Sequence, residues 1–138
     1  MEKQSLIEFS YISRAKDPFS KLQLIQLFDK AFNSNTANQI TGVLFYENRY
    51  FAQILEGSRE DISHLWKKIQ NDNRHVIIRE LDFRAIDERA FPNWGMRFFG
   101  ADRIAKYIPG LRGCLNGLSD NDTKLLTLMR SVAALDKS

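Results

Sequence analysis

Two side chains in this sequence carry hydrogen-bonding chemistry inside segments that look apolar and buried. Tyr11 lies within FSYISRAKDP, and Gln53 lies between Ala52 and Ile54 in YFAQILEG. A buried amide without partners costs on the order of a few kcal/mol, so Gln53 must reach a polar edge or a partner such as the Tyr11 hydroxyl. An amide both donates and accepts hydrogen bonds without carrying a charge. The pair is therefore a candidate site.

Three further residues could belong to the same site. Asn35 is expected just after the first helix, and Trp94 and Met96 are expected in the final strand, in NWGMRF. Because Trp94 and Met96 alternate with Gly95, they should share one side of that strand. That side faces Gln53 if the two strands are neighbours. Which of them packs beside Gln53 stays open, and each alone is explained equally well as a core residue.

The residue types that most often carry catalysis do not form a site here. His64 and His75 stand apart from any cluster of metal ligands, and His64 is expected on the solvated surface. There is no Gly-rich phosphate loop and no nucleophile elbow. The acidic pairs Glu60-Asp61 and Asp87-Glu88 suit helix capping and solvation. The sequence predicts neither an enzyme nor a metal site.

The composition of the chain limits its domain number, its partners and its location. The 138 residues suit one domain with a real hydrophobic core, and the net charge of +3 is spread along the chain rather than clustered for nucleic acid. The single cysteine, Cys114, excludes an intrachain disulfide. No segment approaches the roughly 18 apolar residues of a membrane span, and the N-terminus lacks a signal-peptide pattern. We expect a cytoplasmic protein without membrane or direct nucleic-acid binding.

The strands and helices that must position these residues follow from apolar patterning. Asp17, as N-cap, and Pro18 mark the start of a first helix, which should end before a polar link at 33–38. Ser58 should cap a second helix that ends at 71–73. Five strands are expected, at 6–13, 40–46, 50–55, 76–83 and 95–99, the second and third joined as a hairpin through 47–49.

The two helices differ in how much apolar surface they present. The first has an arc wider than packing on one sheet face requires, which leaves one side free to bury something else. Its apolar residues are Leu22, Leu24, Ile25, Leu27, Phe28, Ala31 and Phe32. The second has a single buried stripe made of Ile62, Leu65, Trp66 and Ile69.

This βαββαββ order predicts an α+β fold, a ferredoxin-like sandwich with an extra strand and both helices on one face of the sheet. Beyond Gly100 the pattern changes to short helical pieces broken at Pro109-Gly110, followed by a last helix with Ser119 as a candidate cap. Its apolar stripe is Leu125, Leu128, Met129, Val132 and Leu135. We therefore divide the chain into a domain at 1–100 and a helical extension at 101–138, which could be a lid or an output element.

Two other functions are compatible with such a sheet. Strand aromatics in GVLFYENRYFAQ could stack RNA bases, but the strand motif of basic, glycine and aromatic residues is missing. An acylphosphatase-like enzyme would need a phosphate-cradling loop after the first strand, which is also missing.

Three blocks of the sequence, in order, resemble the BLUF family, sensors of blue light using flavin. They are FSYISRAKDP, NSNTANQITGVLFYENRYFAQILEGSRE and NDNRHVIIRELDFRAIDERAFPNWGMRF. The resemblance covers about residues 5–100 and falls away in the C-terminal helices. It implies a flavin held non-covalently between the two helices, with FAD expected first and FMN or riboflavin as alternatives.

The resemblance also implies roles for individual residues. Leu27, Phe51 and Ile69 would line the flavin ring, and Asn35 would hold its carbonyl edge. Lys68 and Asp72, four residues apart on the second helix, would face the same way and join Arg74 at the other polar edge, although a simple Lys68–Asp72 surface ion pair explains the spacing as well.

By the same resemblance, Tyr11 would donate an electron and then a proton to the excited flavin. Gln53 would rotate or tautomerise so that it donates a new hydrogen bond to the flavin carbonyl, and Trp94 and Met96 would carry the change outward. With residues 101–138 beyond the sensor, output is expected through an unknown downstream protein or a homo-oligomer. A competing interpretation keeps the fold and treats the pocket as a relic in a binding module that does not respond to light.

Overall fold

A computed structural model describes residues 5–112, 115 and 122–137; Cys114 and Ser119 lie outside this range. Its centre is a five-stranded sheet in the order β4-β1-β3-β2-β5. All neighbouring strands are antiparallel except β2 and β5, which run parallel. The strands are β1 (Leu6–Ala15), β2 (Thr41–Glu47), β3 (Tyr50–Ser58), β4 (His75–Ala85) and β5 (Arg97–Phe99). The predicted ferredoxin-like α+β order is confirmed.

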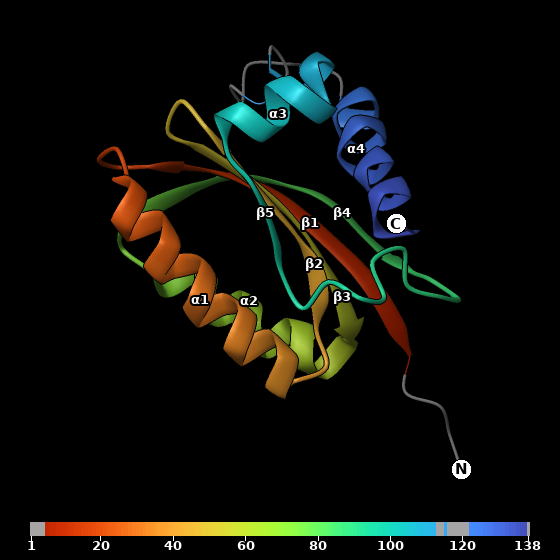
Figure 1. The fold of residues 1–138 in the computed structure, drawn as a ribbon. Coiled ribbons are helices and arrows are strands. Elements are labelled where there is room, and N and C mark those ends of the chain that lie inside the picture. The colour runs from red at the N-terminus through yellow and green to blue at the C-terminus, as the bar shows by residue number, and fades with distance from the viewer. Residues whose placement is uncertain (1–4, 113–114, 116–121, 138) are drawn as a thin grey trace.

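Helices α1 (Lys21–Ala37) and α2 (Arg59–Asn71) cover one face of the sheet (Figure 1). The predicted start of α1 at Asp17 and Pro18 is wrong, because Ser20 is the N-cap. Its hydroxyl oxygen accepts from the Gln23 N–H while the Gln23 side chain accepts from the Ser20 N–H. This capping box satisfies two N–H groups that the helix itself leaves free.

The end of α1 also differs from the prediction. The helix continues through the expected link at 33–38 as far as Ala37, and Asn38 is its C-cap. Asn35 therefore lies in the last turn rather than after the helix. The wide apolar arc is not all buried, since Leu22, Ile25 and Phe32 are exposed to solvent. The side that faces the sheet carries Leu24, Leu27, Phe28 and Ala31, each half-buried.

Helix α2 follows the sequence closely. Ser58 is its N-cap and accepts from the Asp61 N–H, and the helix ends at Asn71 with Asp72 as C-cap. Ile62 is fully buried, and Leu65, Trp66 and Ile69 pack against the same core. His64 is exposed, as predicted. The hairpin between β2 and β3 turns at Asn48 and Arg49, both with positive φ, which matches the right-handed twist of the strands.

The opposite face of the sheet is covered by the C-terminal elements, as Figure 1 shows for α4. They are α3 (Ala101–Tyr107), the 3-10 turns η1 (Pro109–Leu111) and η2 (Val132–Lys137), and α4 (Asp122–Ser131). Leu125 and Met129 of α4 are fully buried in one cluster with Phe45 and Ile54 of the sheet. Within the described residues, no helix has the length and apolar character needed to cross a membrane.

The last strand departs most from expectation. β5 begins at Arg97, so Trp94 and Met96 precede it, and it pairs with β2 rather than with the strand of Gln53. The reason is a turn at residues 91–94, closed by a hydrogen bond from the Trp94 N–H to the Phe91 carbonyl. The Trp94 carbonyl then accepts from Gly42 at the edge of β2.

Candidate functional site

A cavity of about 260 Å³ lies between α1, α2 and the sheet. Its lining includes three side chains that are cross-strand neighbours on adjacent strands. Gln53 of β3 is directly opposite Tyr11 of β1 on one side and Leu44 of β2 on the other. Antiparallel partners present their side chains to the same face, so the pairing itself brings these residues together.

The Tyr11 hydroxyl donates a hydrogen bond of 2.5 Å to Gln53 Oε1. Both side chains are almost fully buried. At its other end the Gln53 amide donates from Nε2 to the Met96 sulfur at 3.8 Å, a weak acceptor. Gln53 thus bridges a phenol and a thioether, and of the two alternatives left open by the sequence it was the Tyr11 partner that was correct.

Met96 and Trp94 lie on opposite sides of the sheet. Met96 belongs to the core beneath α1 and α2, whereas Trp94 packs in the C-terminal core, with its ring stacked 5.3 Å from that of Phe91. The expectation that both share one side and face Gln53 is therefore wrong. Met96 is the residue beside Gln53.

Asn35 closes the cavity from α1. It is almost fully buried, and its Nδ2 donates to the Gly95 carbonyl at 3.2 Å, between Trp94 and Met96. The same side chain lines the cavity. Asn35 therefore contacts both the cavity and the segment that carries Met96.

Charged groups also line the cavity. Asp72 and Arg74 form a two-pronged ion pair, with Arg74 Nε 2.9 Å from Oδ1 and Nη2 2.6 Å from Oδ2. This hydrogen bonding from Arg74 lowers the pKa of Asp72 to about 2. Lys68 and Lys30 line the same cavity. The ion pair of Asp72 is thus with Arg74, and not with Lys68 as the alternative interpretation had it.

Every residue that the sequence suggested for cofactor binding lies around this one cavity: Tyr11, Leu27, Asn35, Phe51, Gln53, Lys68, Ile69, Asp72 and Arg74. Trp94 does not. Their contacts with a cofactor remain a prediction. The family resemblance suggested them from β1, α1, β3, α2 and the turn after α2, and the fold brings them together around one cavity.

The remaining lining residues were missed: Phe19, Lys30, Ala31, Ser34, Leu44, Leu65 and His75. Helical spacing could have found most of those on the helices, because Ala31 and Ser34 follow Leu27 at i+4 and i+7. His75 was dismissed as isolated. Its ring nitrogens lie 2.7 Å from the Ser13 hydroxyl and 2.7 Å from the Ile69 carbonyl, so it joins β1 to the end of α2.

Burial sets the protonation state of the phenol. It raises the pKa of Tyr11 above the ordinary value near 10, and the nearby Asp72 carboxylate raises it further. Tyr11 is therefore a neutral hydrogen-bond donor at physiological pH. A neutral phenol, a neutral amide and apolar walls make a site that can rearrange hydrogen bonds without moving a net charge.

A family described as "Sensors of blue-light using FAD" matches residues 6–97 of the chain. The chain belongs to the BLUF family. BLUF domains bind a flavin and sense blue light, and the BLUF domain itself is a photosensor rather than a catalyst.

Solved BLUF proteins share the fold. BlrB, in a dark-state structure, has a TM-score of 0.83 at 28% identity, over 96% of this chain and 98% of that one. BlsA, in a photo-activated state, has a TM-score of 0.77 at 28% identity, over 93% and 94% of the two chains.

Curated relatives are much longer than this chain. The photoactivated adenylate cyclase subunit beta of Euglena longa is 34% identical over 128 residues, 92% of this chain but 15% of the cyclase subunit. The subunit alpha of Euglena gracilis is 32% identical over 126 residues, 91% and 12% respectively. The chain thus spans about a seventh of the beta subunit, and the cyclase activity in these names is theirs.

The cavity of this BLUF domain fits a flavin ring system. Phe51, Leu27 and Ile69 give it apolar walls, and two buried amides, Gln53 and Asn35, offer both donors and acceptors to a polar ring edge. Its volume of about 260 Å³ is slightly below the roughly 300–1,000 Å³ usual for ligand pockets.

Proposed function

We propose that this BLUF domain switches by exchanging the two ends of the Gln53 amide. The observation that carries the proposal is the arrangement of Gln53 between its two neighbours: Oε1 accepts from Tyr11 and Nε2 donates to Met96. An amide held between a donor and a weak acceptor has one favourable orientation, and reversing it changes the hydrogen bonds of both neighbours at once.

The flavin, when bound, supplies the absorption of blue light and an excited state that accepts an electron. Tyr11 is the nearby phenol, and its hydroxyl proton points at Gln53 Oε1. Rotation of the amide would place its NH₂ group toward Tyr11 and its carbonyl oxygen toward the Met96 sulfur. Tautomerisation would instead move a proton from Nε2 to Oε1, so that Oε1 becomes a hydroxyl donor. Neither change moves a net charge, which suits a site where burial makes charged forms costly.

The cofactor-binding residues of the proposal are Tyr11, Leu27, Asn35, Phe51, Gln53, Lys68, Ile69, Asp72 and Arg74. FAD is favoured by the description of the family, with FMN and riboflavin as alternatives. Asp72, Arg74 and Lys68 would bind the polar part of the cofactor, a role supported by their place in the cavity lining. Arg74 and Lys68 bring positive charge, which suits a phosphate-bearing flavin.

Met96, rather than Trp94, would be the first residue to pass the change on, since it contacts Gln53. The helical extension at 101–138 would present the output to a downstream protein or to a second copy of the chain. We favour output through residues outside the cavity because the C-terminal elements cover the face of the sheet opposite the cavity.

The test is an absorption spectrum of the purified, FAD-reconstituted protein before and after blue light. We expect the main flavin band to shift to the red and to return in the dark. Gln53→Leu should bind flavin and lose the shift. Gln70→Leu, at an exposed glutamine of α2 outside the cavity lining, is the matched control and should keep it.

Protein that takes up no added flavin would contradict the proposal and leave a binding module with a relic pocket. A red shift that survives in Gln53→Leu would keep the flavin but remove Gln53 from the switch.

A further inference from the structure

Two buried carboxylates outside the cavity have no part in the proposed switch. Glu8 of β1 is 1% exposed and Glu56 of β3 is 0% exposed. They are directly opposite each other in the β1–β3 pairing, so their side chains share one face of the sheet, the face away from the cavity. Like charges in this position destabilise a sheet. Their partners must therefore compensate, and those partners come from two different parts of the chain.

Glu56 binds the segment between β4 and β5. Its two oxygens accept from the Ala90 N–H at 2.7 Å, from the Phe91 N–H at 3.0 Å and from the Thr41 hydroxyl at 2.9 Å. Arg89 adds a bond to the same hydroxyl and one to the Glu56 carbonyl. Burial raises the pKa of Glu56, and these hydrogen bonds oppose that rise. The start of the segment is thus fixed to β2 and β3.

The same segment continues to Met96, and hydrogen bonds and close packing restrict its movement. The Trp94 N–H donates to the Phe91 carbonyl, and the Trp94 carbonyl accepts from Gly42. Gly95 lies so close to α1 that a Cβ there would be 2.7 Å from the Thr36 hydroxyl. Met96 is thus joined to the Phe91–Glu56 contact by a short segment that is hydrogen-bonded and closely packed.

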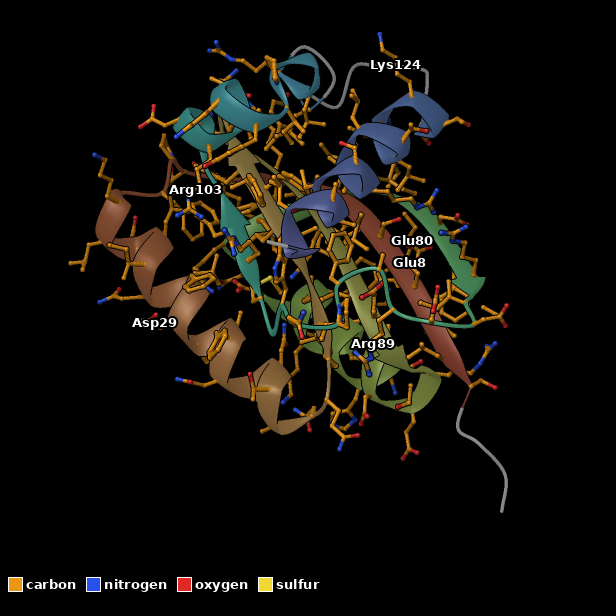
Figure 2. The ribbon with its side chains drawn as sticks, turned by 45° about the vertical axis from the view of Figure 1, so that its right-hand side comes forward. Glu8, Asp29, Glu80, Arg89, Arg103 and Lys124 are labelled. Carbon is orange, nitrogen blue, oxygen red and sulfur yellow. The ribbon has the colours of Figure 1, made fainter. Side chains whose placement is uncertain are left out.

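Glu8 binds the C-terminal helix. Arg130 of α4 donates to Glu8 Oε1 from Nη2 at 2.6 Å and from Nε at 3.1 Å. Arg84 of β4 donates to the same carboxylate, and Arg130 also reaches Asp82 at 3.1 Å. Figure 2 shows α4 in front of the sheet, with Glu8 and Arg89 labelled. The carboxylate opposite Glu56 is therefore one of the contacts that anchor α4, beside the ion pair from Arg79 of β4 to Asp122 of α4 at 2.7 Å.

We propose that Glu56 is a positioning residue of the light switch, which fixes the segment ending at Met96 and, through the directly opposed Glu8, couples that segment to Arg130 of α4. This inference rests on the proposed function, because Met96 moves only if Gln53 switches. When Met96 shifts, the hydrogen bonds on Glu56 loosen, the repulsion between the two carboxylates changes, and the contact of Glu8 with Arg130 changes with it. Helix α4 is then released from the sheet to the degree that this anchor is lost.

The variant Glu56→Gln tests the hydrogen bonds between the Glu56 carboxylate and its donors. Glutamine keeps the shape but has one acceptor oxygen where the carboxylate has two, so its NH₂ group must face one of the donors on Ala90, Phe91 or Thr41. Arg130→Met breaks the other end of the path and keeps the apolar stem. Arg112→Met is the matched control, because Arg112 also ties the C-terminal segment to the sheet, through Glu47, without touching Glu8 or Glu56.

The experiment compares hydrogen–deuterium exchange of α4 in the dark and under continuous blue light, with the flavin spectrum recorded on the same FAD-loaded samples. Wild type and Arg112→Met should show faster exchange of α4 in the light. Glu56→Gln and Arg130→Met should lose this difference between dark and light while they keep the full red shift of the flavin band.

Three results would overturn the proposal. The first is a red shift in wild type without any light-dependent exchange in α4. The second is an unchanged light-dependent difference in both Glu56→Gln and Arg130→Met. The third is loss of the red shift in folded, flavin-loaded Glu56→Gln, which would place Glu56 in the switch itself. Absence of a red shift in wild type would instead be a failure of the proposed function, seen before any variant is compared.

Discussion

At the scale of single residues, the Gln53 amide has its two ends in different surroundings, a phenol on one side and a sulfur on the other. The bond from Tyr11 is the stronger of the two, because a hydroxyl is a good donor and thioether sulfur is a weak acceptor. In this structure the orientation of the amide is therefore set by Tyr11 more than by Met96.

Replacing Tyr11 with phenylalanine tests this directly. Gln53 Oε1 would be left buried without its donor, which costs about 1–3 kcal/mol. We expect a lower free energy of unfolding in urea and no light-induced red shift. Tyr107→Phe is the control, since Tyr107 is exposed, and its stability should stay within about 0.5 kcal/mol of wild type. Equal losses in the two variants would argue against an energetic role of the Tyr11–Gln53 bond.

Tyr11 and Gln53 could be predicted from the sequence because each is a polar residue within an apolar strand. His75 could not, because its partners are a backbone carbonyl and a serine hydroxyl from elements distant in the sequence. The partners of Glu56 could not be predicted either, because two of its donors are backbone N–H groups that any sequence carries and the third is the Thr41 hydroxyl.

At the scale of elements, the C-terminal end of α2 carries the clearest electrostatic feature of the site. Asp72 caps the helix and binds Arg74 through both carboxylate oxygens. Because the folded pKa is lowered to about 2, below the unfolded value near 3.9, the ion pair stabilises the fold above about pH 4. That contribution is lost as the pH falls from about 4 toward 2.

We therefore expect Asp72→Asn to unfold more easily than wild type in urea at pH 7, and the difference to shrink as the pH falls below 4. Its size at pH 7 should be at most about 1 kcal/mol, since half of the Arg74 side chain is in water. Asp29→Asn, at an exposed position on α1, is the control and should differ little from wild type at pH 7. A gap that widened in acid would contradict the assigned sign.

The element boundaries were predicted correctly where the sequence offers one capping residue and wrongly where it offers several, or where backbone hydrogen bonds decide. Ser58 and Asp61 fixed the start of α2 correctly. Asp17 and Pro18 suggested a start for α1, but Ser20 is the N-cap, because its side chain and that of Gln23 form reciprocal hydrogen bonds. The strand expected from Gly95 starts later because residues 91–94 form a turn held by backbone hydrogen bonds, which apolar patterning does not reveal.

At the scale of the whole molecule, the sheet has an apolar core on each face. The division at residue 100 remains a prediction, but the extension beyond it supplies one side of the second core. Ile104, Leu111, Leu125 and Met129 are all fully buried there. A protein cut at residue 100 would expose the apolar face of the sheet, so point variants are a cleaner way to study the output.

Leu125→Ala measures how much this second core contributes. Removing a fully buried leucine side chain costs about 2–5 kcal/mol, and we expect a loss in that range from urea unfolding although Leu125 lies outside the cavity. Leu22→Ala makes the same chemical change at a residue that is 63% exposed, and should cost less than about 1 kcal/mol. Similar small losses for both would mean that α4 is only loosely bound to the sheet.

The register of the β1–β3 pairing has a consequence for the folding of the protein. Tyr11 faces Gln53 on one side of the sheet and Glu8 faces Glu56 on the other, in one continuous register. A slip of one residue would turn β1 over, sending Tyr11 into the C-terminal core and Glu8 toward the cofactor cavity. A misregistered chain would then lose its chromophore site and its helix anchor together. After refolding with flavin, the ratio of flavin absorbance to total protein would therefore measure the fraction of chains with the correct β1–β3 register.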